Sequence, residues 1–314
     1  MENIIETQEL VKIFKNNTIA LNGISIGIKK GEIMGFLGPN GAGKTTTVRL
    51  LSCLLKPTSG DAFVFGKSIK EDPLSIRERI GVLTENHGLY ERMTVEENMK
   101  FFSSFYSESW EQNKSNFEKL LEEFNLEDRR NAKVGTLSKG LRQRAALIKT
   151  LIHDPELIFL DEPTSGLDPK ATAEFRDYIK YLGKKRDKTI IICTHNLTEA
   201  QKLCSRIAII NKGKIMKVGP PSELERVLWK SSIFRFISTK PFPADLQGRI
   251  EAGNDAQVLS IDGPEMMLSF QSKPDTEVIP NIIEDLVSLK IPVFQVIRAS
   301  HSLEDIYLKL MEEA

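Results

Sequence analysis

The residues best suited to chemistry lie in one short segment near the amino terminus, GPNGAGKT at positions 38–45. The pattern G-x-x-x-x-G-K-T is typical of a loop that curls its backbone N–H groups around phosphate oxygens, which glycines permit. Lys44 is placed to reach β- and γ-phosphates, and the Thr45 hydroxyl is a suitable ligand for Mg²⁺. We therefore expect the chain to bind a nucleoside triphosphate.

A strand and a helix must flank such a loop, and the sequence predicts both. Residues 32–37 form a short apolar run typical of a buried strand, and residues 46–55 have helical spacing. The helix would direct the positive end of its dipole at the phosphates. An accidental match in a glycine-rich turn is the alternative, and the flanking elements argue against it. The predicted nucleotide contacts are Gly38, Pro39, Asn40, Gly41, Ala42, Gly43, Lys44, Thr45 and Thr46.

A second candidate group follows the apolar run at residues 157–160, which ends in Asp161 and Glu162. A run that is apolar on both faces suits a central parallel strand, whose carboxyl end lies on the side of the phosphate loop. Asp161 would then help to hold Mg²⁺, and Glu162 would polarise the attacking water. The alternative is a solvated turn in which the two acids do no chemistry.

Three further positions are informative only in combination with these groups. Ser138 precedes a segment of helical spacing and suits a helix N-cap, which by itself indicates only a capped amphipathic helix. Phe14 is either a ring that stacks on a nucleotide base or an ordinary aromatic residue of the core. His195 follows a strand-like run at residues 189–193, and a lone histidine there is more often structural.

Composition limits the classes of function. The 314 residues suit two domains, and a hydrophobic fraction of 40% is enough for a core. Lys plus Arg and Asp plus Glu both number 43, so the zero net charge argues against bulk nucleic-acid binding. Cys53, Cys193 and Cys204 have no metal-ligand spacing, which suggests reduced thiols in a cytosolic protein. We find neither a signal peptide nor a spanning segment, so any work at a membrane would require docking on a partner.

The order of the remaining elements predicts two domains. Strand-like segments at 4–14 and 19–28 suggest a hairpin sheet ahead of the phosphate loop, and residues 93–123 have a helical pattern. The composition changes after residue 221. Beyond it, the order βαββαβ and a final helix at 302–311 predict a small ferredoxin-like α+β domain.

Taken together, the motifs resemble those of the ATP-binding subunits of ABC transporters over residues 2–224. GPNGAGKT resembles the Walker A loop, and residues 157–161 with Glu162 resemble Walker B and its catalytic glutamate. LSKGL at 137–141 resembles the signature motif, SGLD at 165–168 the D-loop, and His195 the switch histidine. Five motifs that follow one another along the chain as they do in the family make the resemblance highly specific.

The resemblance implies a fold and a partnership. The fold is an α/β P-loop core with an N-terminal antiparallel β subdomain and a helical signature subdomain at about residues 90–152, within a domain at 1–221. Residues 222–314 would form the C-terminal accessory domain. Two ATP-binding units pair head to tail in that family, and we expect the second unit to be another copy of this chain. Mg²⁺ and ATP are the implied cofactors.

The resemblance also assigns residues. Ser138 and Gly140 would contact the γ-phosphate of an ATP held by the partner copy, because a helix N-terminus attracts anions. Asp168 would line the nucleotide site from the D-loop, and His195 would hydrogen-bond the γ-phosphate. The subunit would dock on a transmembrane permease at the inner, cytoplasmic face of the cell membrane.

Two positions depart from the family pattern. The signature reads SKGL where the common form is SGGQ, so Lys139 and Leu141 change the rim of the partner site. Glu85 stands where the Q-loop glutamine is expected; it is either a hard oxygen ligand for Mg²⁺ or a solvated loop acid. The sequence around Glu85 resembles a branch that energises exporters of drugs, ions or lipids, and this branch carries a similar C-terminal domain.

The alternative function is that of a non-transport relative acting on ribosomes or DNA. Such relatives usually carry two cassettes in one chain or a long coiled coil between the motifs, and this sequence has neither. Its balanced charge also argues against nucleic acid as a partner. A plain P-loop kinase or GTPase would have no use for the Ser138 helix or for the Asp168 loop.

Overall fold

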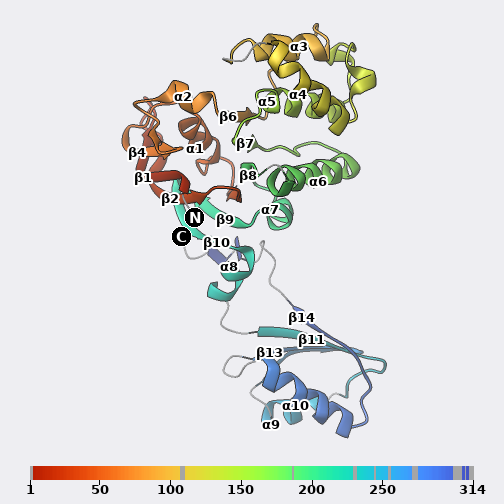
Figure 1. The fold of residues 1–314 in the computed structure, drawn as a ribbon. Coiled ribbons are helices and arrows are strands. Elements are labelled where there is room, and N and C mark those ends of the chain that lie inside the picture. The colour runs from red at the N-terminus through yellow and green to blue at the C-terminus, as the bar shows by residue number, and fades with distance from the viewer. Residues whose placement is uncertain are drawn as a thin grey trace. The chain divides into compact units, whose positions relative to one another are not determined.

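The computed structural model describes residues 3–106, 110–185, 187–228, 232–243, 245–253, 256–270, 275–299, 306–307 and 309–310. The chain forms two compact units, Met1–Pro221 and Ser222–Ala314 (Figure 1). Helix α8 (Pro221–Leu228) begins at the boundary between them. No helix in the described ranges has both the length and the apolar character needed to cross a bilayer.

The first unit contains a six-stranded sheet in the order β10-β9-β3-β8-β7-β6. Its strands are β3 (Ile33–Leu37), β6 (Ile80–Leu83), β7 (Leu157–Asp161), β8 (Thr189–Thr194), β9 (Arg206–Asn211) and β10 (Lys214–Gly219). All neighbours are parallel except β9 and β10. Strands β7 and β8 are buried along their whole length, as central parallel strands must be. The central parallel strand predicted at residues 157–160 is therefore confirmed.

A four-stranded antiparallel sheet in the order β2-β1-β4-β5 lies in the same unit. Its strands are β1 (Asn3–Ile13), β2 (Ile19–Lys29), β4 (Ser59–Val64) and β5 (Lys67–Ser68), and they include the predicted hairpin. One apolar cluster joins this sheet to the larger one: Ile5 and Leu21 pack in the same core as Phe36 and Phe159. This shared core fixes the phosphate loop between the two sheets.

The helices of the first unit include the predicted nucleotide-loop helix and signature helix. They are α1 (Lys44–Leu51), α2 (Pro73–Arg77), α3 (Val95–Ser103), α4 (Trp110–Glu123), α5 (Lys139–Leu151), α6 (Pro169–Lys185) and α7 (Leu197–Leu203). Helices α3, α4 and α5 pack against one another at one end of the unit (Figure 1). The expected helix at 46–55 ends at Leu51, before Cys53 adopts a left-handed φ of 59°.

The second unit has a four-stranded antiparallel sheet in the order β12-β13-β11-β14. Its elements are β11 (Ser232–Ser238), α9 (Leu246–Gly253), β12 (Gln257–Asp262), β13 (Glu265–Phe270), α10 (Asp275–Ser288) and β14 (Val293–Ala299). Phe236, Leu268 and Ile282 form part of its core. The expected βαββαβ order is present, with the first and third strands central, as in ferredoxin-like domains. Of the helix expected at 302–311, residues 306–307 and 309–310 are helical, and the others lie outside the described residues.

Candidate functional site

The candidate site forms where three neighbouring parallel strands end. Leu37 of β3 pairs with Thr194 of β8, and Asp161 of β7 pairs with Cys193 of β8. The segments that follow these strands therefore begin side by side at the carboxyl edge of the sheet. This edge is where ligands bind in parallel α/β sheets.

The phosphate loop is held so close to neighbouring backbone that two of its positions require glycine. A Cβ on Gly38 would lie 2.2 Å from the Ile210 carbonyl oxygen. Gly43 has a φ of 111°, and a Cβ there would lie 2.6 Å from the Ala20 carbonyl oxygen. Gly43 is also the N-cap of α1 and makes no side-chain cap, so the first amides of the helix are available to a ligand.

The Lys44 side chain folds back onto the backbone of the phosphate loop. Its side chain is buried, and Nζ donates to the carbonyl oxygens of Gly38 at 2.8 Å and Pro39 at 3.1 Å. The same Nζ lies 3.9 Å from Glu162 Oε1. The predicted cation and the predicted general base are thus neighbours, and a bound phosphate would compete with the loop carbonyls for the ammonium group.

Asp161 and Thr45 form the second part of the site. Thr45 Oγ1 donates to Asp161 Oδ1 at 3.3 Å, and Asp161 is buried. Burial raises the pKa of the Asp161 carboxyl; the Thr45 hydrogen bond opposes this shift, and the charges of Glu162 and Glu85 add to it. Glu85 itself is exposed on the segment after β6. Hydroxyl and carboxylate oxygens therefore meet at a place that carries excess negative charge.

Glu162 is held by the end of β8 and by His195, the residue that follows it. Its backbone adopts a left-handed φ of 49°, and its N–H donates to the Cys193 carbonyl oxygen at 2.8 Å. Glu162 Oε1 accepts from the His195 backbone N at 3.1 Å and contacts His195 Nδ1 at 2.9 Å. Thr194 Oγ1 lies 3.3 Å from Glu162 Oε2. The structure therefore joins His195 to Glu162, and it adds Thr194, which the sequence reasoning missed.

The signature residues lie on other elements. Ser138 is the N-cap of α5, as predicted, and its Oγ accepts from the Leu141 N–H at 3.4 Å. Ser138 is exposed and Gly140 is half-buried. Asp168 is exposed before α6, where Oδ1 accepts from the Ala171 N–H at 2.9 Å. No contact within this chain joins these three residues to the Walker A loop among the interactions of the described residues.

The start of the signature helix touches the D-loop of the same chain. A Cβ on Gly166 would overlap the Lys139 ammonium group, so that side chain lies directly over the glycine. Gly166 has a φ of 68°, which favours glycine for a second reason. The departure from the common signature at Lys139 is accommodated by this small residue.

Phe14 does not belong to the core. It lies just beyond β1 with 37% of its surface exposed, and Lys12 Nζ stands 5.6 Å from the centre of its ring. A base-stacking role stays a prediction.

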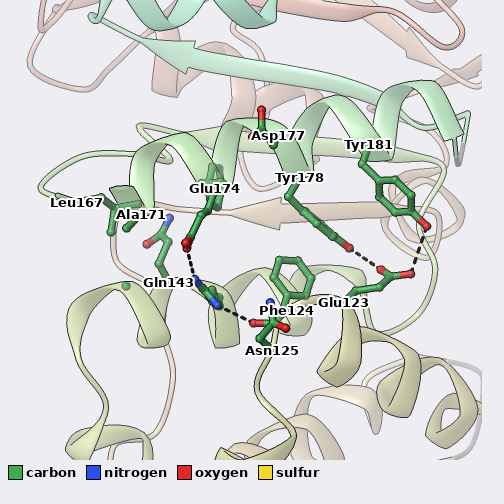
Figure 2. A pocket seen from close by; sticks show the side chains of 13 residues that line it. Glu123, Phe124, Asn125, Gln143, Leu167, Ala171, Glu174, Asp177, Tyr178 and Tyr181 are labelled. Atoms are coloured by element: carbon green, nitrogen blue, oxygen red, sulfur yellow. Dashed lines mark hydrogen bonds and ion pairs between the residues drawn. The ribbon is translucent and has the colours of Figure 1, made fainter. Parts of the chain in front are cut away.

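A cavity of about 370 Å³ separates α5 from α6, and Figure 2 shows the contacts across it. Arg144 of α5 forms an ion pair with Glu174 of α6 and donates to the Phe124 carbonyl oxygen at 3.0 Å. Tyr178 of α6 donates to Glu123 Oε2 at 2.9 Å. The remaining lining residues are Asn125, Gly140, Gln143, Leu167, Ala171, Phe175, Asp177 and Tyr181. These contacts connect the helical region to the helix that follows the D-loop.

Comparison with known proteins gives the family. A family model described as ABC transporter matches residues 21–165. YhcH of Bacillus subtilis, an ABC transporter ATP-binding protein, is 34% identical over 314 residues, which is 100% of this chain and 97% of YhcH. This chain belongs to the ATP-binding proteins of ABC transporters. The bacitracin transport ATP-binding protein BcrA of Bacillus licheniformis is 38% identical over 226 residues, 72% of each chain.

Solved ABC cassettes have the same fold. The structure of cbiO1 from Clostridium perfringens matches with a TM-score of 0.66 at 28% identity, and the match covers 73% of this chain and 94% of cbiO1. The cassette MJ0796, solved as a dimer bound to ADP and Pi, matches with a TM-score of 0.62 at 26% identity over 69% of this chain and 98% of its own.

The predicted family and fold class are thereby confirmed. The protein is an ABC ATPase that binds and hydrolyses ATP. ATP-binding subunits of ABC transporters work with transmembrane permeases and dimerise. The roles of single residues stay predictions.

Proposed function

We propose that this ABC ATPase powers a separate transmembrane permease that exports a drug, an ion or a lipid. Two relatives support this substrate class: BcrA, and the daunorubicin/doxorubicin resistance ATP-binding protein DrrA of Streptomyces peucetius, which is 37% identical over 224 residues. Glu85 in place of the Q-loop glutamine agrees with it. The permease would hold the subunit at the inner, cytoplasmic face of the membrane.

Glu162 is the residue that we assign to the attacking water. Its carboxylate lies at the carboxyl edge of the sheet, 3.9 Å from the ammonium of Lys44, which would bind the γ-phosphate. His195 contacts the same carboxylate and would hydrogen-bond the γ-phosphate. The clustering of Lys44, Glu162 and His195 is the observation that carries the catalytic assignment.

The residues at Asp161 fit a magnesium ion. Thr45 and Asp161 bring hard oxygen donors together, and the charge of Glu85 raises the pKa of Asp161 from nearby. No three His, Cys, Asp or Glu side chains of the described ranges form a metal site alone, as expected where phosphate oxygens supply further ligands. When bound, Mg²⁺ would neutralise charge on the β- and γ-phosphates.

The exposed Ser138 helix suggests how two copies would share ATP. Ser138 and Gly140 make no contact with their own Walker A loop among the described interactions, and the helix N-terminus at Ser138 is a suitable anion site. We assign this site to the γ-phosphate of an ATP bound by a second copy, with Asp168 beside it. The dimeric ADP-bound cassette among the structural relatives supports the pairing.

A groove of about 480 Å³ in the first unit would receive the permease. It lies among α2, α3, α5 and β6, and its walls carry the exposed side chains of Leu54, Leu74 and Phe105, at 57%, 71% and 68%. Exposed apolar surface of this kind marks interaction sites. We assign it to a short amphipathic helix of the permease, because the exposed charged residues Arg77 and Glu78 also line the groove and would face the polar side of such a helix.

The domain at residues 222–314 would act as a dimer-stabilising or regulatory module. We infer this from the resemblance of its βαββαβ order to the extension found in the exporter branch. The sequence offers no catalytic constellation in it.

Affinity purification of the full chain from membranes tests the proposed function. We expect a small polytopic membrane protein to co-purify, and Leu74→Glu together with Phe105→Glu should abolish capture without changing ATP affinity. Exposed Val287 in the second unit, changed to Glu, is the matched control. Capture of nucleic acid in a salt-sensitive manner, without a membrane protein, would favour the ribosome- or DNA-acting alternative.

A further inference from the structure

A second acid, Glu199, is linked to Glu162 through the hydroxyl group of Thr194. Glu199 of α7 is only 2% exposed, and its Oε2 lies 3.1 Å from Thr194 Oγ1. The same hydroxyl oxygen is 3.3 Å from Glu162 Oε2. One threonine hydroxyl therefore stands between two carboxyl groups, one of them buried and the other assigned to the attacking water.

The Thr194 hydroxyl has a single proton, so it can donate to only one of the two carboxyl groups. Thr194 Oγ1 has one proton and two lone pairs, and the Asn196 N–H donates to one lone pair at 3.0 Å. If both acids were ionised, the hydroxyl would donate to one of them and turn its remaining lone pair towards the other. If Glu199 is neutral, it donates into that lone pair, and the Thr194 proton serves Glu162.

The surroundings of Glu199 favour the neutral form. Its Oε1 is buried and makes no hydrogen bond among the described residues. An ionised carboxylate with such an oxygen would be poorly solvated, whereas a neutral carboxyl group tolerates it better. Burial raises the pKa of Glu199 and the charge of Glu162 adds to this shift, while the nearby Thr164 and Thr194 hydroxyls oppose it.

Helix capping does not account for Glu199. A glutamate at the third helical position commonly accepts from the backbone N–H of the N-cap residue, as Glu97 of α3 does from Thr94 at 2.7 Å. Glu199 holds the same position in α7, yet the N–H of its N-cap, Asn196, donates to Thr194 Oγ1 instead. The Glu199 side chain instead contacts Thr194, at the end of β8.

We propose that Glu199 is a positioning residue for ATP hydrolysis, which acts as a neutral acid through Thr194. The Glu199 carboxyl group donates to Thr194 Oγ1, and the Thr194 hydroxyl in turn donates to Glu162 Oε2. With Oε1 held by His195, both oxygens of Glu162 are then fixed in the orientation needed towards water. This inference rests on the proposed role of Glu162.

Substitutions that differ in their ability to donate test the chain of hydrogen bonds. In the full-length protein, we expect Glu199→Leu to lower kcat for ATP at least tenfold, with KM and nucleotide affinity unchanged within twofold. Glu199→Gln still offers an N–H to Thr194 and should recover most of that loss. Thr194→Val should resemble Glu199→Leu, and the double variant should be no slower than the slower single one, because both remove the same link.

Leu203→Ala is the matched control, since Leu203 is a buried residue at the opposite end of the same helix. It should lower Tm without lowering kcat. Equal impairment of the Gln and Leu variants at Glu199, or a kcat loss in Leu203→Ala as large as in Glu199→Leu, would overturn the proposal. Hydrolysis that persists in Glu162→Gln would instead overturn the role of Glu162, whereas an inactive Glu162→Gln with a normal Glu199→Leu refutes only the Glu199 inference.

Discussion

Replacing Gly38 by alanine should disrupt nucleotide binding because of one backbone contact. The added Cβ would lie 2.2 Å from the Ile210 carbonyl oxygen and 3.3 Å from its carbonyl carbon. Since both groups belong to buried backbone, the loop must move by roughly 1 Å to restore an ordinary contact. A loop amide displaced by this distance loses a hydrogen bond to a charged phosphate, worth about 1.5–3 kcal/mol, so we expect the Kd for ATP to rise about 100-fold, or ~2.8 kcal/mol.

Gly41→Ala separates this clash from general damage to the loop. Gly41 also has a positive φ, 81°, but a Cβ there would meet nothing within 4 Å. Only backbone strain of about 1–2 kcal/mol is expected, mostly in stability, and ATP affinity should fall less than tenfold. Calorimetric titration of both variants with ATP decides the matter. Equal losses in the two variants, or wild-type affinity in Gly38→Ala, would refute the argument.

Three further predictions concern other parts of the first unit. Lys44→Ala should abolish ATP binding measured by titration, and unchanged affinity would refute the Walker A assignment. Burial lowers the pKa of His153 to about 4, below its unfolded value near 6.5. The folded state therefore binds fewer protons than the unfolded state. The contribution of His153 to the free energy of unfolding is complete above pH 6.5 and is lost as the pH falls towards 4. Between pH 7.5 and pH 5, the unfolding free energy of the wild type should fall by about 2 kcal/mol more than that of His153→Gln, measured by urea unfolding; an equal fall in the two proteins would contradict this reasoning. Tyr178→Phe removes a hydrogen bond to Glu123 and should cost about 1 kcal/mol of unfolding free energy, and no change in Tm would contradict a structural role for that contact.

The sequence was sufficient where the chemistry is local. The strand that ends at Asp161 could be recognised because it is apolar on both faces. The cap at Ser138 follows from residue type and helical spacing, and the loop at residues 38–45 from its motif. In each case, neighbouring residues alone determine the structure.

Features that depend on distant segments could not be predicted. The link from Glu199 to Glu162 requires α7 to pack against β8 and the end of β8 to adjoin the end of β7. By spacing alone, Glu199 has the position of an ordinary capping residue. The accommodation of Lys139 by Gly166 depends on contact between two motifs that are separate in the chain. The helical pattern at 93–123 was recognised, but not its division into α3 and α4.

The central claim is that ATP held by the Walker A loop of one copy is completed by Ser138 of another. The most direct measurement is the mass in solution of Glu162→Gln, by light scattering, with and without ATP and Mg²⁺. We predict a dimer only with ATP, and a monomer when Ser138→Arg is added to the same variant. A monomer with saturating ATP, or a dimer that forms equally without nucleotide and with Ser138→Arg, would contradict the account.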